Sequence, residues 1–377
     1  MATEALINPA IVTWARIRAG LSENALAKKL NLSKSDKVFD WEFGRAKPTF
    51  VQAQKIASVT NIPLGYLFLP TPPQEQLPIP DLRTVGNTKS HQASPEMMDI
   101  LRQVRQKQEW YKDYLIQSDQ KPLPFIGKFN IESSYLDIVN DIRSVLKVPR
   151  PEKGSWEDYQ SQLIQSAENA RILVMRSGIV GANTHRKLQV REFRGFAISD
   201  PIAPVIFINS SDAPTARLFT LVHELAHLWI GCSGISDMED SHSKVEKLCN
   251  SVAGEFLVPK QEFLAAWSKD FSVDRNFLEI SSMFHVSKLV VAKRALDHAK
   301  ITAEQYWEFY NSELRKFREK ESSGGDFYNT TGAKNSRILS SAVIAETMSG
   351  RLLLRDAANL LSITPDKIKT YARKLVL

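Results

Sequence analysis

Two histidines and a glutamate lie close together in the segment His223-Glu224-Leu225-Ala226-His227. In an α-helix, residues four positions apart share one face, so both imidazoles can bind one metal ion. Two histidines at this spacing commonly hold zinc, and the glutamate between them serves as a general base beside the metal. The spacing therefore predicts one Zn²⁺ ion bound by His223 and His227, with Glu224 as the catalytic base of a hydrolase.

The sequence around this motif predicts the helix that it needs. The segment TARLFTLVHELAHLWIG favours a helix that starts at Ala213 or Pro214, runs to Ile230 and ends at Gly231. An ordinary surface helix with two incidental histidines would have a broad polar face, but this segment is apolar on its remaining sides. We therefore expect a buried helix.

The third metal ligand has to come from another part of the chain. A metzincin has glycine and histidine three and six residues after the second histidine, and Ile230 and Ser233 occupy those positions here, which excludes that family. Further along, Glu246 and Asn250 are four residues apart on a predicted helix and share a face. We expect Glu246 to bind the metal and Asn250 to hold a histidine ligand by a hydrogen bond.

Three other residues compete with Glu246 for this role. His242 lies in the polar segment SDMEDSHSK and is expected to be solvated. Cys249 is expected to be a small buried residue. Glu255 lies nine residues after Glu246, about half a turn from its face, and is expected to pair with a neighbouring group.

Two apolar segments before the motif predict short buried strands, Ile172–Met175 and Ala203–Asn209. A peptidase also needs a donor for the oxyanion, for which the candidates are His185, Arg194 and Tyr135, although each also fits a structural or exposed role. The second strand holds the residues that we expect to pair with an extended substrate peptide: Val205, Ile206, Phe207 and Ile208.

The first seventy residues predict several short helices, with a tight turn at Asn31–Ser33 that is typical of a helix-turn-helix. Asp36, Asp40 and Glu42 on the expected recognition helix would repel phosphates, so a protein contact is about as well supported as DNA binding. The residues that could contact DNA are Lys34, Ser35, Lys37, Arg45 and Lys47.

Two C-terminal segments, Ile280–Ala295 and Leu352–Pro365, also have helix-turn-helix spacing. The simpler interpretation, which we prefer, is helical packing with solvated basic side chains. The residues that could otherwise meet phosphates or an acidic partner are Lys288, Lys293, Arg294, Lys367, Lys369, Arg373 and Lys374.

Composition excludes several classes of protein. The 377 residues are 43% hydrophobic and 24% charged, which is too apolar for a wholly disordered chain. Two cysteines cannot form a disulfide scaffold, and no apolar run suggests a membrane span or a signal peptide. We therefore expect a cytoplasmic protein. The net charge of +7 is uneven, because residues 1–60 carry +4, residues 126–265 carry −2 and residues 266–377 carry +5.

These patterns predict an α+β fold that is predominantly helical, with a small sheet in a zincin-like domain. The polar helix expected from Ser94 to Leu115 would connect domains or mediate a dimer. The expected divisions are a helix-turn-helix domain at 1–72, a Pro-rich linker and connecting helix at 73–125, a metallopeptidase domain at 126–265, a helical region at 266–321 and a C-terminal helical subdomain at 326–377.

Two long stretches resemble known families. GLSENALAKKLNLS and WEFGRAKPTFVQAQKIA resemble the XRE-type (lambda-repressor-like) helix-turn-helix. RGFAISDPIAPVIFINSSDAPTARLFTLVHELAHLWIG, with VEKLCNSVAGEFLVP, resembles the ImmA/IrrE zinc metallo-endopeptidases. The resemblance implies zinc ligands His223, His227 and Glu246, with Glu224 as base. Cys249 and Val252 depart from that family's usual residues without removing a chemical group.

The resemblance implies a zinc endopeptidase that regulates transcription by cleaving a protein such as a helix-turn-helix repressor. A second hypothesis is a DNA-binding regulator whose peptidase-like domain acts as a sensor. A third is an interaction protein whose front domain mimics or recruits a repressor.

Overall fold

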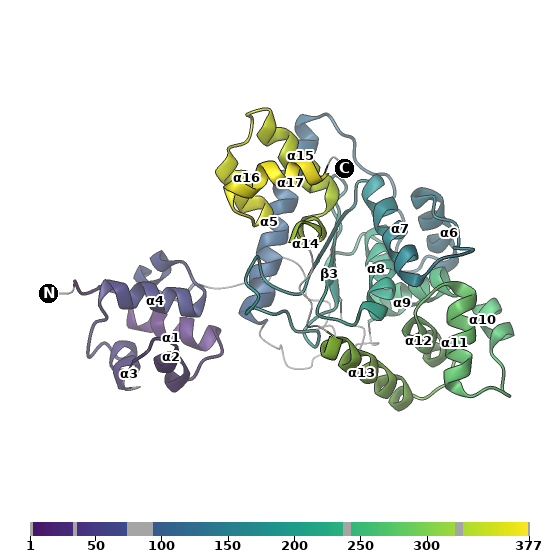
Figure 1. Ribbon diagram of the computed structural model, residues 1–377, viewed down its shortest axis with the longest axis horizontal. Coiled ribbons are helices and arrows are strands. Elements are labelled where there is room, and N and C mark those ends of the chain that lie inside the picture. Colours follow the sequence, from purple (N-terminus) through teal and green to yellow (C-terminus); the bar gives the residue numbers. More distant parts are fainter. Residues whose placement is uncertain (1–2, 33–35, 74–92, 237–242, 321–326, 376–377) are drawn as a thin grey trace. The chain divides into compact units, whose positions relative to one another are not determined.

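The computed structural model describes residues 3–32, 36–73, 93–236, 243–320 and 327–375. Helices dominate these residues and the strands form one small sheet (Figure 1), which confirms the predicted α+β, predominantly helical class. None of the helices among them is long and apolar enough to cross a bilayer. The contacts divide the chain into two units, residues 1–77 with 91–99, and residues 78–90 with 100–377.

The first unit is built from short helices whose starts are fixed by side-chain caps. The Ser22 hydroxyl accepts a hydrogen bond from the Ala25 amide, and Thr49 forms a capping box with Gln52. The apolar faces of these helices form their own core, which includes Ile11, Leu26 and Trp41. The elements are α1 (Pro9–Arg18), α2 (Glu23–Lys29), α3 (Asp36–Glu42), α4 (Phe50–Thr60) and the 3₁₀ helix η1 (Leu64–Phe68).

Three of the five candidate DNA-contacting residues lie in the described part of this unit. Lys37, Arg45 and Lys47 are all exposed, whereas Lys34 and Ser35 lie outside the described residues. The guanidinium of Arg45 lies 5.1 Å from the ring centroid of Phe39.

The second unit surrounds a four-stranded sheet with strand order β1-β3-β2-β4. Strand β3 is parallel to β1 and antiparallel to β2, and β4 pairs with the other edge of β2. The sequence predicted β1 and β3 but not the shorter β2 and β4. The strands are β1 (Leu173–Ser177), β2 (Gly195–Ile198), β3 (Val205–Asn209) and β4 (Gly234–Ser236).

The expected pairing of Val205, Ile206, Phe207 and Ile208 with a substrate peptide is wrong. These residues form the interior strand β3, and both of its edges already bond to neighbouring strands. All four are buried. A strand that is covered on both faces has apolar residues at every position, which explains the continuous apolar run in the sequence. The apolar run therefore indicated a strand in the centre of the sheet, whereas an added substrate strand can pair only with a strand at the edge of the sheet.

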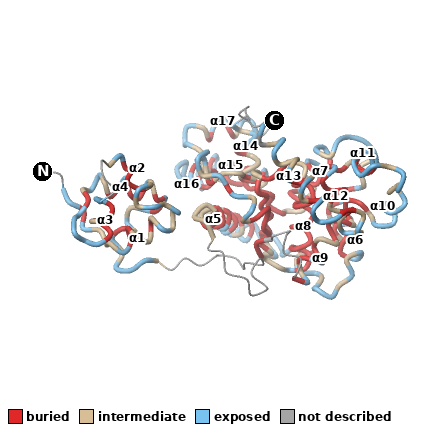
Figure 2. Tube along the Cα trace, turned by 90° about the horizontal axis from the view of Figure 1, so that it is seen from below, coloured by how far each residue is buried: buried red, intermediate tan, exposed pale blue. Residues whose placement is uncertain are grey.

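Helices α8 and α9 form the middle of this unit and share one large hydrophobic core with the sheet (Figure 2). Helix α8 begins with Pro214 at its first position, as expected for a residue without an amide hydrogen, and every residue from Leu218 to Trp229 is buried. The helices up to this core are α5 (Pro95–Gln117), α6 (Tyr135–Leu146), α7 (Trp156–Asn169), α8 (Pro214–Trp229) and α9 (Lys244–Leu257).

Helices after α9 continue this core and then form a C-terminal bundle. In α12, Arg294 is buried and binds Glu255 and the Val258 carbonyl, so this side chain packs inside the protein rather than facing solvent or phosphates. The elements are α10 (Lys260–Ala266), α11 (Val273–Phe284), α12 (Lys288–Asp297), α13 (Ala303–Lys320), α14 (Phe327–Asn335), α15 (Arg337–Met348), α16 (Leu354–Leu361), the 3₁₀ helix η3 (Pro365–Lys367) and α17 (Ile368–Leu375).

Candidate metal centre

Helices α8 and α9 bring three candidate ligands together. One ligand atom from each of His223, His227 and Glu246 lies within 4.8 Å of the other two, and all three side chains are buried. The two histidine Nε2 atoms are 3.1 Å apart, and the Glu246 carboxylate oxygens lie 3.1 Å from Nε2 of His223 and 3.3 Å from Nε2 of His227. The structure therefore places two imidazoles and a carboxylate around one point.

These separations fit a small tetrahedral ion. Metal–ligand bonds of about 2.0–2.1 Å to nitrogen and oxygen give a tetrahedron with edges of about 3.3 Å. The 3.1 Å between the two Nε2 atoms is close to that value. The Glu246 carboxylate faces both imidazoles at similar distances, with Oε2 3.1 Å from His223 and Oε1 3.3 Å from His227. Two nitrogens and one oxygen, with a fourth position left for water, form the donor set of a hydrolytic zinc site. The residues present therefore fit the metal that the sequence predicts.

The charge state of the cluster also suits a cation. Burial acts to raise the pKa of Glu246, but the two imidazoles outweigh it and leave that pKa lowered to about 2. Burial acts to lower the pKa of His223, but Glu246 outweighs it, so this pKa is raised. Burial lowers the pKa of His227. The carboxylate is therefore ionised, and metal binding is expected to release a proton from the imidazole pair.

Asn250 fixes the orientation of one ligand. Its Oδ1 atom lies 3.1 Å from Nδ1 of His223, so the ring donates its Nδ1 hydrogen there and turns Nε2 toward Glu246. Glu246 and Asn250 lie one turn apart on α9, as the four-residue spacing predicts.

Asn250→Ala should therefore weaken metal binding by about 10–100-fold, because the His223 ring loses the acceptor that orients it. Competition with a chromophoric chelator measures this affinity. Asn250→Asp keeps an acceptor and should bind more tightly than Asn250→Ala. An alanine variant that binds metal as the wild type does would contradict this role.

Glu224 lies one residue beyond His223 on α8, is fully buried and faces strand β2. A Cβ atom added to Gly195 would lie 2.7 Å from Oε1 of Glu224 and 3.0 Å from the carbonyl oxygen of Phe207. The absence of a side chain at Gly195 is thus what leaves room for the Glu224 carboxylate beside the sheet. The sequence analysis did not identify Gly195, because its importance depends on β2, which was not predicted.

Gly195→Ala is expected to displace Glu224 and to cost about 1–3 kcal/mol of stability through overpacking. Peptide hydrolysis should fall while metal content stays at the wild-type level, because Gly195 lies on β2 and the three ligands lie on α8 and α9. Thermal unfolding and steady-state kinetics test both effects. Wild-type kinetics in this variant would show that Glu224 tolerates the shift.

The competing ligands are accounted for by other interactions. Cys249 is buried in the large hydrophobic core, and burial raises the pKa of its thiol. Glu255 binds Arg294, with 2.5 Å between its Oε2 and the guanidinium Nη2. His242 lies outside the described residues.

The three candidates for the oxyanion donor differ in position. His185 is exposed, and Tyr135 is half-buried at the start of α6, where it packs against the large core. Arg194 is buried beside Asp212, with 3.9 Å between guanidinium and carboxylate, and its guanidinium lies 4.3 Å from the ring centroid of Tyr310. Asp212 also accepts a hydrogen bond of 2.6 Å from the Tyr310 hydroxyl. Arg194 is thus part of a buried network at the start of α8.

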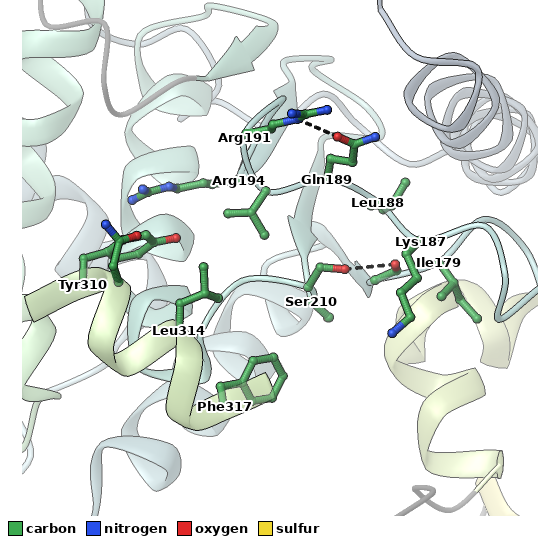
Figure 3. A pocket seen from close by; sticks show the side chains of 14 residues that line it. Ile179, Lys187, Leu188, Gln189, Arg191, Arg194, Ser210, Tyr310, Leu314 and Phe317 are labelled. Carbon is green, nitrogen blue, oxygen red and sulfur yellow. Dashed lines mark hydrogen bonds between the residues drawn. The ribbon is translucent and has the colours of Figure 1, made fainter. Parts of the chain in front are cut away.

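Arg194 also lines an open pocket of about 810 Å³ (Figure 3). Leu188 comes from the loop before β2, Ser210 from the turn directly after β3, and Leu314 and Phe317 from α13. The three metal ligands and Glu224 are not among the residues that line it. This pocket and the metal centre are therefore different features of the second unit.

Comparison with known families supports the interpretation of the metal centre. Residues 167–296 match the Peptidase_M78 family of IrrE N-terminal-like domains. This IrrE-like domain covers about a third of the chain, from the end of α7 to α12, and contains all four residues of the candidate site. The match points to a peptidase domain of a metallopeptidase family. A search of curated proteins finds no match to the chain.

A second family model lies beyond the IrrE-like domain. Residues 335–374 match DUF8813, a domain of unknown function. The matched range corresponds closely to helices α15 to α17.

Proposed function

We propose that the protein is a zinc-dependent endopeptidase. The observation that carries this proposal is the buried cluster of His223, His227 and Glu246, with Glu224 next to the first ligand on α8. The chemistry of the donor set and its spacing favour zinc over the hard cations, which prefer oxygen ligands. The match to the Peptidase_M78 family supports the same reaction class.

The protein groups have separate tasks in this reaction. When bound, zinc would lower the pKa of a water ligand and polarise the scissile carbonyl. Glu224 takes a proton from the attacking water and delivers it to the leaving amine. Asn250 keeps the His223 ring in one orientation, and Gly195 leaves space for the Glu224 carboxylate. The four side chains of the site are buried, so the surrounding protein holds them in place.

Strand β4 is the candidate position for the substrate backbone. Among the described residues it is the last strand of the sheet and pairs with β2 on one side, so its other side would accept an extended peptide as an added strand. Its register places Ser236 opposite Gly195, the residue against which Glu224 packs. A peptide paired with β4 would therefore be separated by one strand, β4 itself, from β2, which faces the base.

We further propose that the substrate is a regulatory protein such as a helix-turn-helix repressor, through which the enzyme would control transcription. This step is supported by the resemblance of the sequence to ImmA/IrrE enzymes. The first unit would help to select the substrate, because its surface exposes apolar side chains that suit a protein contact better than phosphates: Phe43 is 62%, Phe50 44% and Val51 60% exposed.

Mapping of new peptide termini tests the proposal in cells. Wild-type protein and Glu224→Gln are produced at equal levels, and termini are compared by mass spectrometry. We expect a small set of new termini with the wild type alone, in one or a few regulatory proteins. Identical termini in both strains would contradict the proposed peptidase.

A further inference from the structure

Helices α15, α16 and α17 form a three-helix unit with helix-turn-helix geometry. Each of the three helices contacts the other two. Helix α16 ends at Leu361, three residues turn the chain, and Pro365 begins the next helical segment, as in a helix-turn-helix. Ser362 adopts the left-handed conformation, with φ of 54°, that such a tight turn requires.

Specific contacts hold the three helices in one arrangement. The Tyr371 hydroxyl of α17 donates a 2.9 Å hydrogen bond to the Ser340 hydroxyl of α15. The Asn335 side chain donates a 2.9 Å hydrogen bond to the Leu361 carbonyl at the end of α16. Ile368 and Tyr371 form the buried side of α17, and Ala357 and Leu361 form that of α16. The outward side of α17 is therefore fixed by packing (Figure 2).

The outward side of α17 is basic. Lys369 and Arg373 are one turn apart and exposed, and neither forms an ion pair within the described residues. Lys367 and Lys374 flank them, each with its ammonium near an aromatic ring of α14, 4.0 Å from the Phe327 centroid and 4.4 Å from that of Tyr328. Helix α17 itself contains no acidic residue.

Polar groups that could read bases lie at the start of this basic face. Thr364 and Thr370 are exposed, and a hydroxyl can donate to or accept from base edges. Asp366 is the one acid beside them, and a carboxylate at such a position can accept a hydrogen bond from cytosine. In helix-turn-helix proteins the early residues of the second helix contact bases while basic residues contact phosphates.

In the residues that the structure describes, the other two segments with helix-turn-helix spacing differ from this pattern. In α12, Arg294 is buried and paired with Glu255. The first unit also exposes basic side chains on and after α3, but they are mixed with the exposed acid Asp36 and with Phe43, which is 62% exposed. Helix α17 is thus the recognition-helix candidate whose exposed side is both polar and predominantly basic.

We propose that α15–α17 bind duplex DNA, with α17 in the major groove. This function is independent of the proposed peptidase activity, because the metal ligands lie on α8 and α9. It would place the proposed peptidase at a DNA site through its C-terminal helices. It also replaces our preferred sequence interpretation of Lys367, Lys369, Arg373 and Lys374 as residues of a solvated packing surface.

Salt-dependent binding of the full chain to a fluorescein-labelled mixed-sequence duplex tests this proposal. We expect the wild type to bind with an affinity that falls as salt rises. The double variant Lys369→Glu with Arg373→Glu should bind at least about tenfold more weakly and reduce the slope of log K against log salt by about 2, since each lost phosphate contact removes about 0.9. Both residues are exposed, so circular dichroism and the unfolding temperature should match the wild type.

Two matched variants make the result specific. Lys153→Glu with Lys269→Glu reverses two exposed charges outside α15–α17 and changes the net charge by the same amount as the α17 variant. Its affinity for the duplex should stay within about twofold of the wild-type affinity. Lys37→Glu with Arg45→Glu reverses two exposed charges of the first unit. A loss of affinity and of salt slope in this variant but not in the α17 variant would assign DNA binding to the first unit and overturn the proposal. The proposal is overturned if the wild type does not bind duplex DNA, or if the α17 variant binds as the wild type does.

Discussion

Glu224→Gln is expected to retain the metal and to lose most peptidase activity. The substitution keeps the size of the side chain and removes the group that accepts a proton, so hydrolysis should slow by about 10²–10⁴-fold, the usual contribution of a general base. Glu224 is fully buried on α8 beside Gly195. The other carboxylate of the site, Glu246, cannot replace it as the base because Glu246 is needed as a metal ligand. Initial rates on a cleaved partner protein, with metal content measured on the same sample, test both parts.

Gly195→Ala serves as a comparison for this variant. It leaves the Glu224 carboxylate in the chain but crowds it, so its loss of activity should be smaller than that of Glu224→Gln. If Glu224→Gln cleaves as fast as the wild type, Glu224 is not the base and the proposed mechanism is wrong.

Glu246→Ala is expected to lose both metal and activity. Its carboxylate is the third donor of the cluster, 3.1 Å and 3.3 Å from the two histidine nitrogens. Hydrolytic zinc sites have three protein ligands, and without Glu246 only the two histidines would remain. Hydrolysis should fall to background, and zinc affinity should fall by more than the 10–100-fold expected when a residue that only orients a ligand is lost.

Glu255→Ala on the same helix is the matched control. Glu255 pairs with buried Arg294 rather than with the metal cluster, so its removal should lower stability by about 3–5 kcal/mol through an uncompensated charge. The folded fraction of this variant should still bind metal with wild-type affinity. The assignment of Glu246 would be contradicted if Glu255→Ala lost metal and Glu246→Ala kept it.

The sequence was most informative where one helix carries the chemistry by itself. The spacing of His223 and His227 predicted their shared face, with Glu224 projecting beside it, and the spacing of Glu246 and Asn250 predicted theirs, because helical periodicity is a local property. The pairing of Asn250 with His223, rather than with His227, depends on how α8 packs against α9. Only the tertiary structure contains that information.

The strands were predicted less well for a physical reason. An apolar run such as Val205–Ile208 predicts a buried strand but not its place in the sheet. Strands β2 and β4 are four and three residues long, too short to show a periodic pattern. The edge strand β4, and the glycine that makes room for Glu224, therefore became visible only in the folded chain.

The central claim is that His223, His227 and Glu246 hold one zinc ion, and metal analysis of the purified full chain tests it most directly. Mass spectrometry of the dialysed protein should find about one zinc per chain in the wild type and in Glu224→Gln, since a site of this type holds a single ion. The double variant His223→Ala with His227→Ala should contain none above background. A wild-type protein without bound zinc, or a double variant that holds as much as the wild type, would contradict the account.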